Sequence, residues 1–211
     1  MEHESHHHHH PHGTGLRWLD ISLGVAAGIV SLVSLWLGLH SAHSMEKLVA
    51  ANSYPYLDLG RSTHIIPKDG AQSELRRKIE YEFLNGGIGP ARIEWVEFTY
   101  KGKPVHNLKE LIGACCSTAE GKGNGFHARG NVQNSLVRPG GSLVMMSWSE
   151  PATPNPLFDA LHRSMDDMDF SACYCSVFDE CYIRKNDASK PQPVEQCTPP
   201  AVPFQPSFQQ N

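Results

Sequence analysis

Six cysteines are the residues of this 211-residue chain whose type and spacing could do chemistry. They are Cys115, Cys116, Cys173, Cys175, Cys181 and Cys197. Neighbouring cysteines can pass a disulfide from one to another, and thiolates can also bind zinc. An even number of cysteines, clustered in one part of the chain, is typical of disulfides formed in an oxidising compartment.

Structural disulfides are the interpretation that the surroundings of these cysteines favour. Exchange chemistry needs a lowered thiol pKa, which a helix N-terminus or a neighbouring cation supplies. The Cys115-Cys116 pair is expected at the C-terminal end of a helix, and acidic residues flank Cys173 to Cys181, so both settings disfavour a thiolate. The spacings also differ from the usual zinc pattern of two C-x2-C pairs.

The pairing of the six cysteines does not follow from the sequence, because six cysteines allow fifteen complete connectivities. A bridge from Cys115 or Cys116 to the Cys173–Cys181 segment would close a long loop, worth about 2–4 kcal/mol. Cys197 lies in a proline-rich tail, where it could pair with this domain or with another chain.

A second set of candidate metal ligands lies in the first fifteen residues, which are rich in histidine. The run is His6, His7, His8, His9 and His10. Neutral imidazole binds zinc, copper and nickel. The alternatives are an expression tag and a natural low-complexity tail without a role. We expect residues 1–15 to be disordered, and we rank these histidines as weak metal candidates.

The remaining residues offer no pattern typical of an enzyme. G-x-S-x-G does not occur in the chain, H-E-x-x-H occurs only within the histidine-rich tail as His3-Glu4-Ser5-His6-His7, and the histidines outside that tail are scattered. The formal charge of −4 and the pI of about 6.3 contrast with the basic surface that nucleic-acid binding requires. The sequence therefore predicts a non-enzymatic protein with no cofactor and no nucleic-acid partner.

The segment from Ile21 to Leu39 carries no charged residue and is long enough to cross a membrane. At 1.5 Å per residue it would extend about 28 Å, close to the ~30 Å hydrocarbon core. A cleaved signal peptide would have a shorter apolar region, and a soluble core helix would rarely be so apolar. We therefore expect a retained signal anchor, with a helix and its extension over residues 16–52.

Small residues lie along one face of this expected span. Gly24 and Gly28 have the small-xxx-small spacing that lets helices approach closely within a membrane. The face could pack against another membrane helix or against a second copy of the chain. The sequence thus predicts a single membrane span with either a protein partner or self-association.

The orientation of the span is predicted mainly from the cysteines. Arg17 precedes the span and Lys47 follows it, so basic residues discriminate weakly between the two orientations. All six cysteines follow the span, which favours an oxidising compartment for that side. We expect a bacterial inner-membrane protein with a cytoplasmic N-terminus and a periplasmic C-terminal domain.

Residues 53–185 show mainly period-two patterns and are expected to form one extracytoplasmic domain. Strands are predicted over 54–59, 75–84, 91–100, 170–178 and 181–183, and a hairpin over 136–148. Asn107 and Asn155 are positioned to cap two short helices. The predicted fold class is mainly β, an immunoglobulin-like β-sandwich with two short helices. Residues 121–130 are expected to form a loop.

Three sequence elements resemble those of uncharacterised proteobacterial single-pass membrane proteins with a small periplasmic domain. They are the segment Asn85-Gly86-Gly87-Ile88-Gly89-Pro90-Ala91, the Cys115-Cys116 pair, and the run Cys173-Tyr174-Cys175-Ser176-Val177-Phe178-Asp179-Glu180-Cys181. The resemblance spans Leu16 to Arg184. It implies the same layout of one helix and one periplasmic domain, and it implies no particular activity.

The last segment, residues 186–211, is rich in proline and is predicted to be an extended, disordered tail, in which Phe204 and Phe208 could contact a partner. Taken together, the patterns favour a membrane-anchored periplasmic interaction or accessory protein. The alternative is a periplasmic metal-binding or thiol-redox protein that uses the histidine tail or the cysteines.

Overall fold

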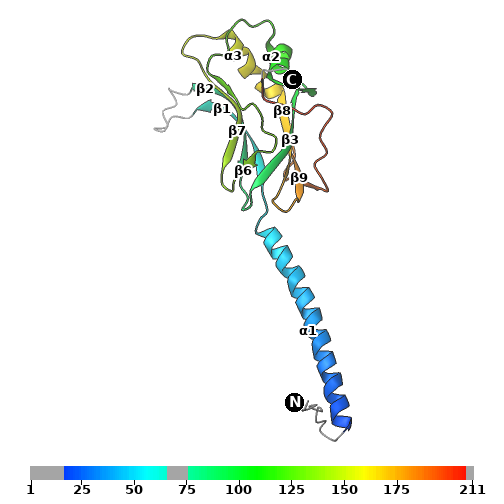
Figure 1. Ribbon diagram of the computed structural model, residues 1–211. Helices are drawn as coiled ribbons and strands as arrows, with labels where there is room; N and C mark the ends of the chain where they lie inside the picture. The colour runs from blue at the N-terminus through cyan, green and yellow to red at the C-terminus, as the bar shows by residue number, and fades with distance from the viewer. Residues whose placement is uncertain (1–16, 66–75, 208–211) are drawn as a thin grey trace, which may run out of the picture. The chain divides into compact units, whose positions relative to one another are not determined.

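The computed structural model describes residues 17–65 and 76–207 of the chain. The chain divides into two compact units, residues 1–49 and 50–211. The histidine run at residues 6–10 lies outside the described residues. Figure 1 shows the helix that forms most of the first unit and the two sheets of the second.

Helix α1 runs from Arg17 to Ala51 and is 35 residues long. It is long and apolar enough to cross a membrane, and its described side chains are exposed. Ser22 and Ser31 donate their hydroxyl hydrogens to backbone carbonyls of the same helix, at 3.0 and 2.8 Å. Both hydroxyl groups thus have a hydrogen-bond partner within the helix, which polar groups need where water is absent. The helix ends ahead of Tyr54-Pro55, because a residue before proline disfavours the helical conformation.

The second unit consists of two antiparallel sheets (Figure 1). The first sheet has the order β1 (Leu57–Ile65), β2 (Arg76–Asn85), β7 (Ser142–Ser149) and β5 (Phe126–Ala128). The second has the order β10 (Gln192–Val194), β9 (Cys181–Lys185), β8 (Met168–Cys175), β3 (Ala91–Tyr100) and β4 (Lys103–Val105), with β6 (Leu136–Val137) also paired to β3. The prediction of a mainly β domain is confirmed at this level.

The structure contradicts two predictions of strands and loops and shifts the bounds of others, since β1 begins at Leu57 rather than at residue 54 and β8 ends at Cys175 rather than at residue 178. Residues 136–148 do not form a hairpin, because β6 pairs with β3 in one sheet and β7 pairs with β2 and β5 in the other. The Pro139-Gly140-Gly141 segment carries the chain between the sheets, with Gly140 at a φ of 65°. Strand β5 lies inside the stretch 121–130 that was expected to be a loop. Period-two patterns identify strands but not their partners, which explains the first difference.

Both predicted helix caps are confirmed. In α2 (Leu108–Cys116) the Asn107 side chain accepts a hydrogen bond from the Glu110 N–H at 2.9 Å. In α3 (Pro156–Arg163) the Asn155 side chain accepts from the Leu157 and Phe158 N–H groups. Such caps satisfy amides that have no partner within the helix. Helices α2 and α3 contact each other, and a short 3-10 helix (Ser164–Asp167) continues α3 into β8.

The core lies between the sheets and is rich in aromatic side chains. Tyr81, Phe83, Phe98 and Phe170 are buried there and make edge-to-face or stacked contacts with one another. Each such burial stabilises the fold by about 1.5–3 kcal/mol. Four methionines are also buried in this core: Met145, Met146, Met165 and Met168. Burial in a core, where the flexible side chain fills irregular gaps, is the common use of methionine.

The glycines of the Asn85–Pro90 loop permit close backbone packing rather than positive φ angles. A Cβ on Gly89 would lie 1.8 Å from the Ser53 carbonyl oxygen, and one on Gly87 would lie 2.3 Å from the Tyr56 nitrogen. The Ile88 N–H donates to the Tyr54 carbonyl at 3.1 Å. The loop therefore holds the segment 53–56, which leads from α1 into the domain.

The proline-rich C-terminal segment belongs to the second unit, and its described part, up to residue 207, is ordered. We call residues 192–207 the C-terminal strap. It begins with β10, which pairs with β9, and Cys197 forms a disulfide with Cys173. Phe204 is buried and stacks on Phe98 with a centroid distance of 5.0 Å.

The strap differs from the disordered tail that its composition predicts. Prolines do prevent a long helix or strand. A disulfide and a buried aromatic ring can nevertheless order a segment that has no regular secondary structure. Phe204, expected to contact a partner, packs instead into the domain's own core.

Candidate functional site

The cysteines of β8 lie on the outer face of the second sheet, away from the core. Along β8 the side chains of Phe170, Ala172 and Tyr174 join the core, so Cys173 and Cys175 point to the other face. A β-bulge in β3 between Ile93 and Trp95 shifts the alternation of that strand. Trp95 consequently lies opposite Cys173 in the ladder, on the same outer face.

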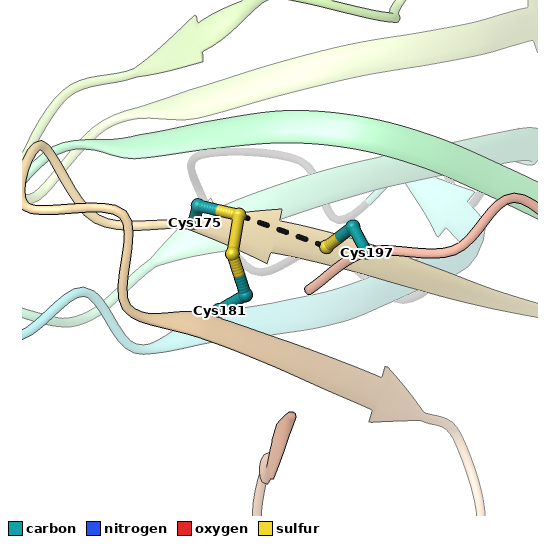
Figure 2. Close-up of side chains that lie close together, drawn as sticks. All are labelled: Cys175, Cys181 and Cys197. Atoms are coloured by element: carbon teal, nitrogen blue, oxygen red, sulfur yellow. Dashed lines mark hydrogen bonds between the residues drawn. A yellow bond between two sulfur atoms is a disulfide. The ribbon is translucent and has the colours of Figure 1, made fainter. Parts of the chain in front are cut away.

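Four sulfurs gather on this face, and we call Cys173, Cys175, Cys181 and Cys197 the sulfur cluster. Cys175 forms a disulfide with Cys181 across the β8–β9 turn, and Cys173 forms one with Cys197 of the strap. The Sγ atoms of Cys175 and Cys197, which belong to different disulfides, lie only 3.7 Å apart (Figure 2). The Sγ atoms of Cys175, Cys181 and Cys197 all lie within 4.8 Å of one another.

The sulfur cluster is shielded from solvent to different degrees. Cys173 is 0% exposed, Cys175 3% and Cys181 7%, whereas Cys197 is partly exposed. A reagent in solution therefore meets Cys197 or Cys181 first. The strap is held to this face by the bond between Cys197 and Cys173 of β8.

The charged groups beside the cluster compensate one another. Arg92 pairs with Cys175 in the ladder, and its guanidinium donates to Glu94 at 2.6 Å and to Asp179 at 2.8 Å. The hydrogen bond to Glu94 is the largest cause of a raised pKa at Arg92, and the hydrogen bond to Asp179 is the next largest. Two carboxylates thus compensate the charge of Arg92, so this guanidinium lowers the pKa of a cysteine beside it less than an unpaired cation would.

The β8–β9 turn that joins Cys175 to Cys181 is tightly hydrogen bonded. The fully buried Ser176 hydroxyl accepts from the Phe178 and Glu180 N–H groups at 3.1 and 3.3 Å, and the Ser176 N–H donates to the Glu180 carbonyl at 2.8 Å. Asp179 adopts a φ of 59°, which aspartate tolerates better than most residues. This turn presents Val177 and Phe178 to solvent.

The third disulfide joins the adjacent residues Cys115 and Cys116 at the end of α2. Cys116 is buried in the core, and Cys115 is partly buried against it. The long loop expected between this pair and the Cys173–Cys181 segment does not form, because Cys173 is bonded to Cys197 of the strap and Cys175 to Cys181. An adjacent pair closes almost no loop, so the entropic gain of a long cross-link does not apply to it.

The other predicted site residues fall in the helix or outside the described residues. Ile21, Gly24, Gly28 and Leu39 all belong to α1, and a Cβ on either glycine would meet nothing within 4 Å. In residues 17–65 and 76–207, one group of three or more potential ligands could hold a metal ion, and it consists of Cys175, Cys181 and Cys197.

Two features of the site are not predicted from the sequence. Trp95 lies beside the sulfur cluster only because of the bulge in β3, which no residue pattern announces. Its buried indole N–H has no acceptor among the described residues. The sequence predicts a strand over the exposed pair Val177-Phe178, although the Asp179-Glu180 bend nearby is a turn signal.

Comparisons with family models, with curated proteins and with solved structures find no match for this chain. Its function is therefore inferred from the geometry described above.

Proposed function

We propose that this chain is a membrane-anchored interaction protein. In this proposal α1 is a signal anchor in a bacterial inner membrane, the N-terminus is cytoplasmic, and the second unit is periplasmic. The length and apolar surface of α1 support the anchor. The three disulfides of the second unit support an oxidising compartment, because disulfides persist there and are rare in the cytosol.

We further propose that the second unit is of the immunoglobulin-like type. The strand order β1-β2-β7-β5 corresponds to the A-B-E-D sheet of that fold, and β9-β8-β3 corresponds to G-F-C. Such sandwiches present loops at the ends of the sheets for binding, as antibody domains do. The likeness in strand order supports a binding role over a catalytic one.

A group of exposed apolar side chains is the observation on which the interaction role depends. Ile88, Leu136, Val177 and Phe178 are 61%, 58%, 53% and 52% exposed. We call these four residues the apolar end. Large apolar side chains that gather in solvent are typical of surfaces that bind another protein.

Pairing within the second sheet brings the apolar end together. Leu136 pairs with Arg92 at the start of β3, and Arg92 forms an ion pair with Asp179 in the turn that carries Val177 and Phe178. Ile88 belongs to the loop that immediately precedes β3 and bonds to Tyr54, which is close in the chain to the end of α1. We therefore propose a partner held in the same membrane, with an apolar surface of its own.

The proposal is tested by replacing the exposed turn side chains in the full-length chain. The double variant Val177→Ser with Phe178→Ser should lose a stoichiometric membrane partner during purification in mild detergent. Val144→Ser is the control, because Val144 is also partly exposed but lies on β7, in the other sheet. A partner that stays with the double variant, or a wild-type chain that emerges alone, would refute the proposed role.

A further inference from the structure

Two disulfides of the second unit lie close enough to exchange partners. The Cys175 and Cys197 sulfurs are 3.7 Å apart, and a disulfide bond is about 2.0 Å long. The two sulfurs therefore need to approach by only about 2 Å to bond, which rotation of their side chains can supply. Figure 2 shows Cys175 between its partner Cys181 and the neighbouring Cys197.

We propose that Cys175, Cys181 and Cys197 form a thiol–disulfide exchange site whose reductant is a protein dithiol. A thiolate of the dithiol attacks Cys181 Sγ, forms a mixed disulfide and expels Cys175 as a thiolate. Cys175 then attacks Cys197 Sγ, forms the Cys175–Cys197 bond and expels Cys173, which takes a proton. The second thiolate of the reductant attacks the mixed disulfide and releases Cys181 as a thiol.

The reaction balances as a two-electron exchange. The domain begins with the disulfides Cys173–Cys197 and Cys175–Cys181. It ends with one disulfide, Cys175–Cys197, and two thiols, Cys173 and Cys181. The dithiol loses two electrons and two protons and becomes a disulfide. Each bond forms by attack of a thiolate on a disulfide sulfur, which is the general route of such exchange.

The location of the cluster allows the exchange without opening the core. Cys173 and Cys175 are two residues apart on one face of β8, so both can reach the same segment of the strap. Cys197 stays bonded to β8 before and after the exchange. The strap is therefore cross-linked to the sheet in both states, and Phe204 can remain in its place in the core.

The exchange can be tested in the full-length chain without any external reductant. The variant Cys181→Ser leaves Cys175 as a free thiol beside the Cys173–Cys197 disulfide. If the site exchanges, the bridge redistributes between Cys173–Cys197 and Cys175–Cys197. Alkylation with iodoacetamide followed by peptide mass spectrometry should then find label on Cys173 as well as on Cys175.

The matched control is Cys116→Ser, which also creates one free thiol, at Cys115 in α2. Cys173 should be labelled at least about tenfold faster in Cys181→Ser than in this control, since exchange within one site gains from proximity. The second measurement is stepwise reduction of the wild-type chain by dithiothreitol, which should yield a form containing the Cys175–Cys197 bridge.

Two results would overturn the proposal. One is a Cys181→Ser chain in which Cys175 alone is labelled while Cys173 and Cys197 stay bonded. The other is a native chain that contains about one zinc ion bound to unoxidised cysteines, which would make these sulfurs a metal site. A double variant Val177→Ser, Phe178→Ser that keeps its partner would refute the interaction role without changing the labelling of Cys173 in Cys181→Ser, so the two proposals fail separately.

Discussion

At the scale of single residues, buried polar side chains fix the segment that leads into the domain. The Tyr174 hydroxyl accepts a hydrogen bond from the Leu57 N–H at 3.3 Å and donates to the Pro55 carbonyl at 3.5 Å. Asn85 donates to the Gly89 and Val137 carbonyls and accepts from the Tyr56 N–H. Each of these bonds satisfies a backbone group that water reaches poorly.

Replacement of Tyr174 by Phe tests the first of these bonds. The Leu57 N–H would lose its acceptor, so the free energy of unfolding at pH 7 should fall by about 1–3 kcal/mol. Urea unfolding of the full-length chain in detergent measures this change. A loss close to zero would mean that water replaces the hydroxyl.

Tyr174→Phe should also change how the free energy of unfolding depends on pH. Burial raises the pKa of Tyr174 above 10, the ordinary value of tyrosine, so the folded chain holds this proton more tightly than the unfolded chain. The associated stability is complete below pH ~10 and is lost as pH rises through the raised pKa. Tyr174→Phe should therefore lose stability less steeply above pH 10 than the wild type. Equal slopes in both chains would contradict this reasoning.

At the scale of elements, the Asn85–Pro90 loop and the segment 53–56 form one tightly packed unit. The loop amides of Gly86, Ile88 and Gly89 donate to the carbonyls of Tyr54 and Tyr56. No side chain fits between the two backbones at Gly87 or Gly89. The glycines thus set the distance between the loop and the start of β1.

Gly89→Ala should be strongly destabilising, because its Cβ would overlap the Ser53 carbonyl and one backbone would have to move. We expect a loss of roughly 1–3 kcal/mol in the free energy of unfolding, or more if the segment detaches. Gly113→Ala is the control, since that glycine is exposed in α2 with nothing within 4 Å of its added Cβ. The control should gain roughly 0.5–1 kcal/mol from helix propensity. Similar thermal melts for both variants would disprove the packing argument.

At the scale of the whole molecule, the proposed function joins an anchor to a disulfide-bearing domain. The chain-entropy model gives the Cys173–Cys197 bridge about 3 kcal/mol of stabilisation, since it links residues 24 positions apart. The Cys175–Cys181 bridge spans only 6 positions and contributes less in the same model. A domain built in this way suits a compartment in which disulfides persist.

The proposed orientation is tested by adding protease to bacterial spheroplasts that carry the full-length chain. The second unit should be cleaved from outside, whereas the N-terminal tail should be cut only after the membrane is dissolved. Antibodies against the two ends of the chain distinguish the fragments. Protection of the C-terminal end together with cleavage of the N-terminal tail would show the opposite orientation and would contradict a periplasmic domain.

Features that depend on neighbours along the chain could be predicted from the sequence. The apolar run predicts α1, alternation predicts most of β2, β3 and β7, and the amides of Asn107 and Asn155 predict the starts of α2 and α3. Helical periodicity, strand alternation and capping all act over a few residues. These three signals can therefore be recognised in the sequence without knowledge of the fold.

Contacts between distant segments became known from the fold. It separated β6 from β7 into different sheets, rotated Trp95 onto the outer face, and brought Cys197 beside Cys175. It also ordered the strap, whose prolines predict disorder but whose Phe204 is buried. The physical reason is that strand pairing, disulfide partners and burial are contacts between residues far apart in the chain, and their stability depends on the whole fold rather than on local sequence.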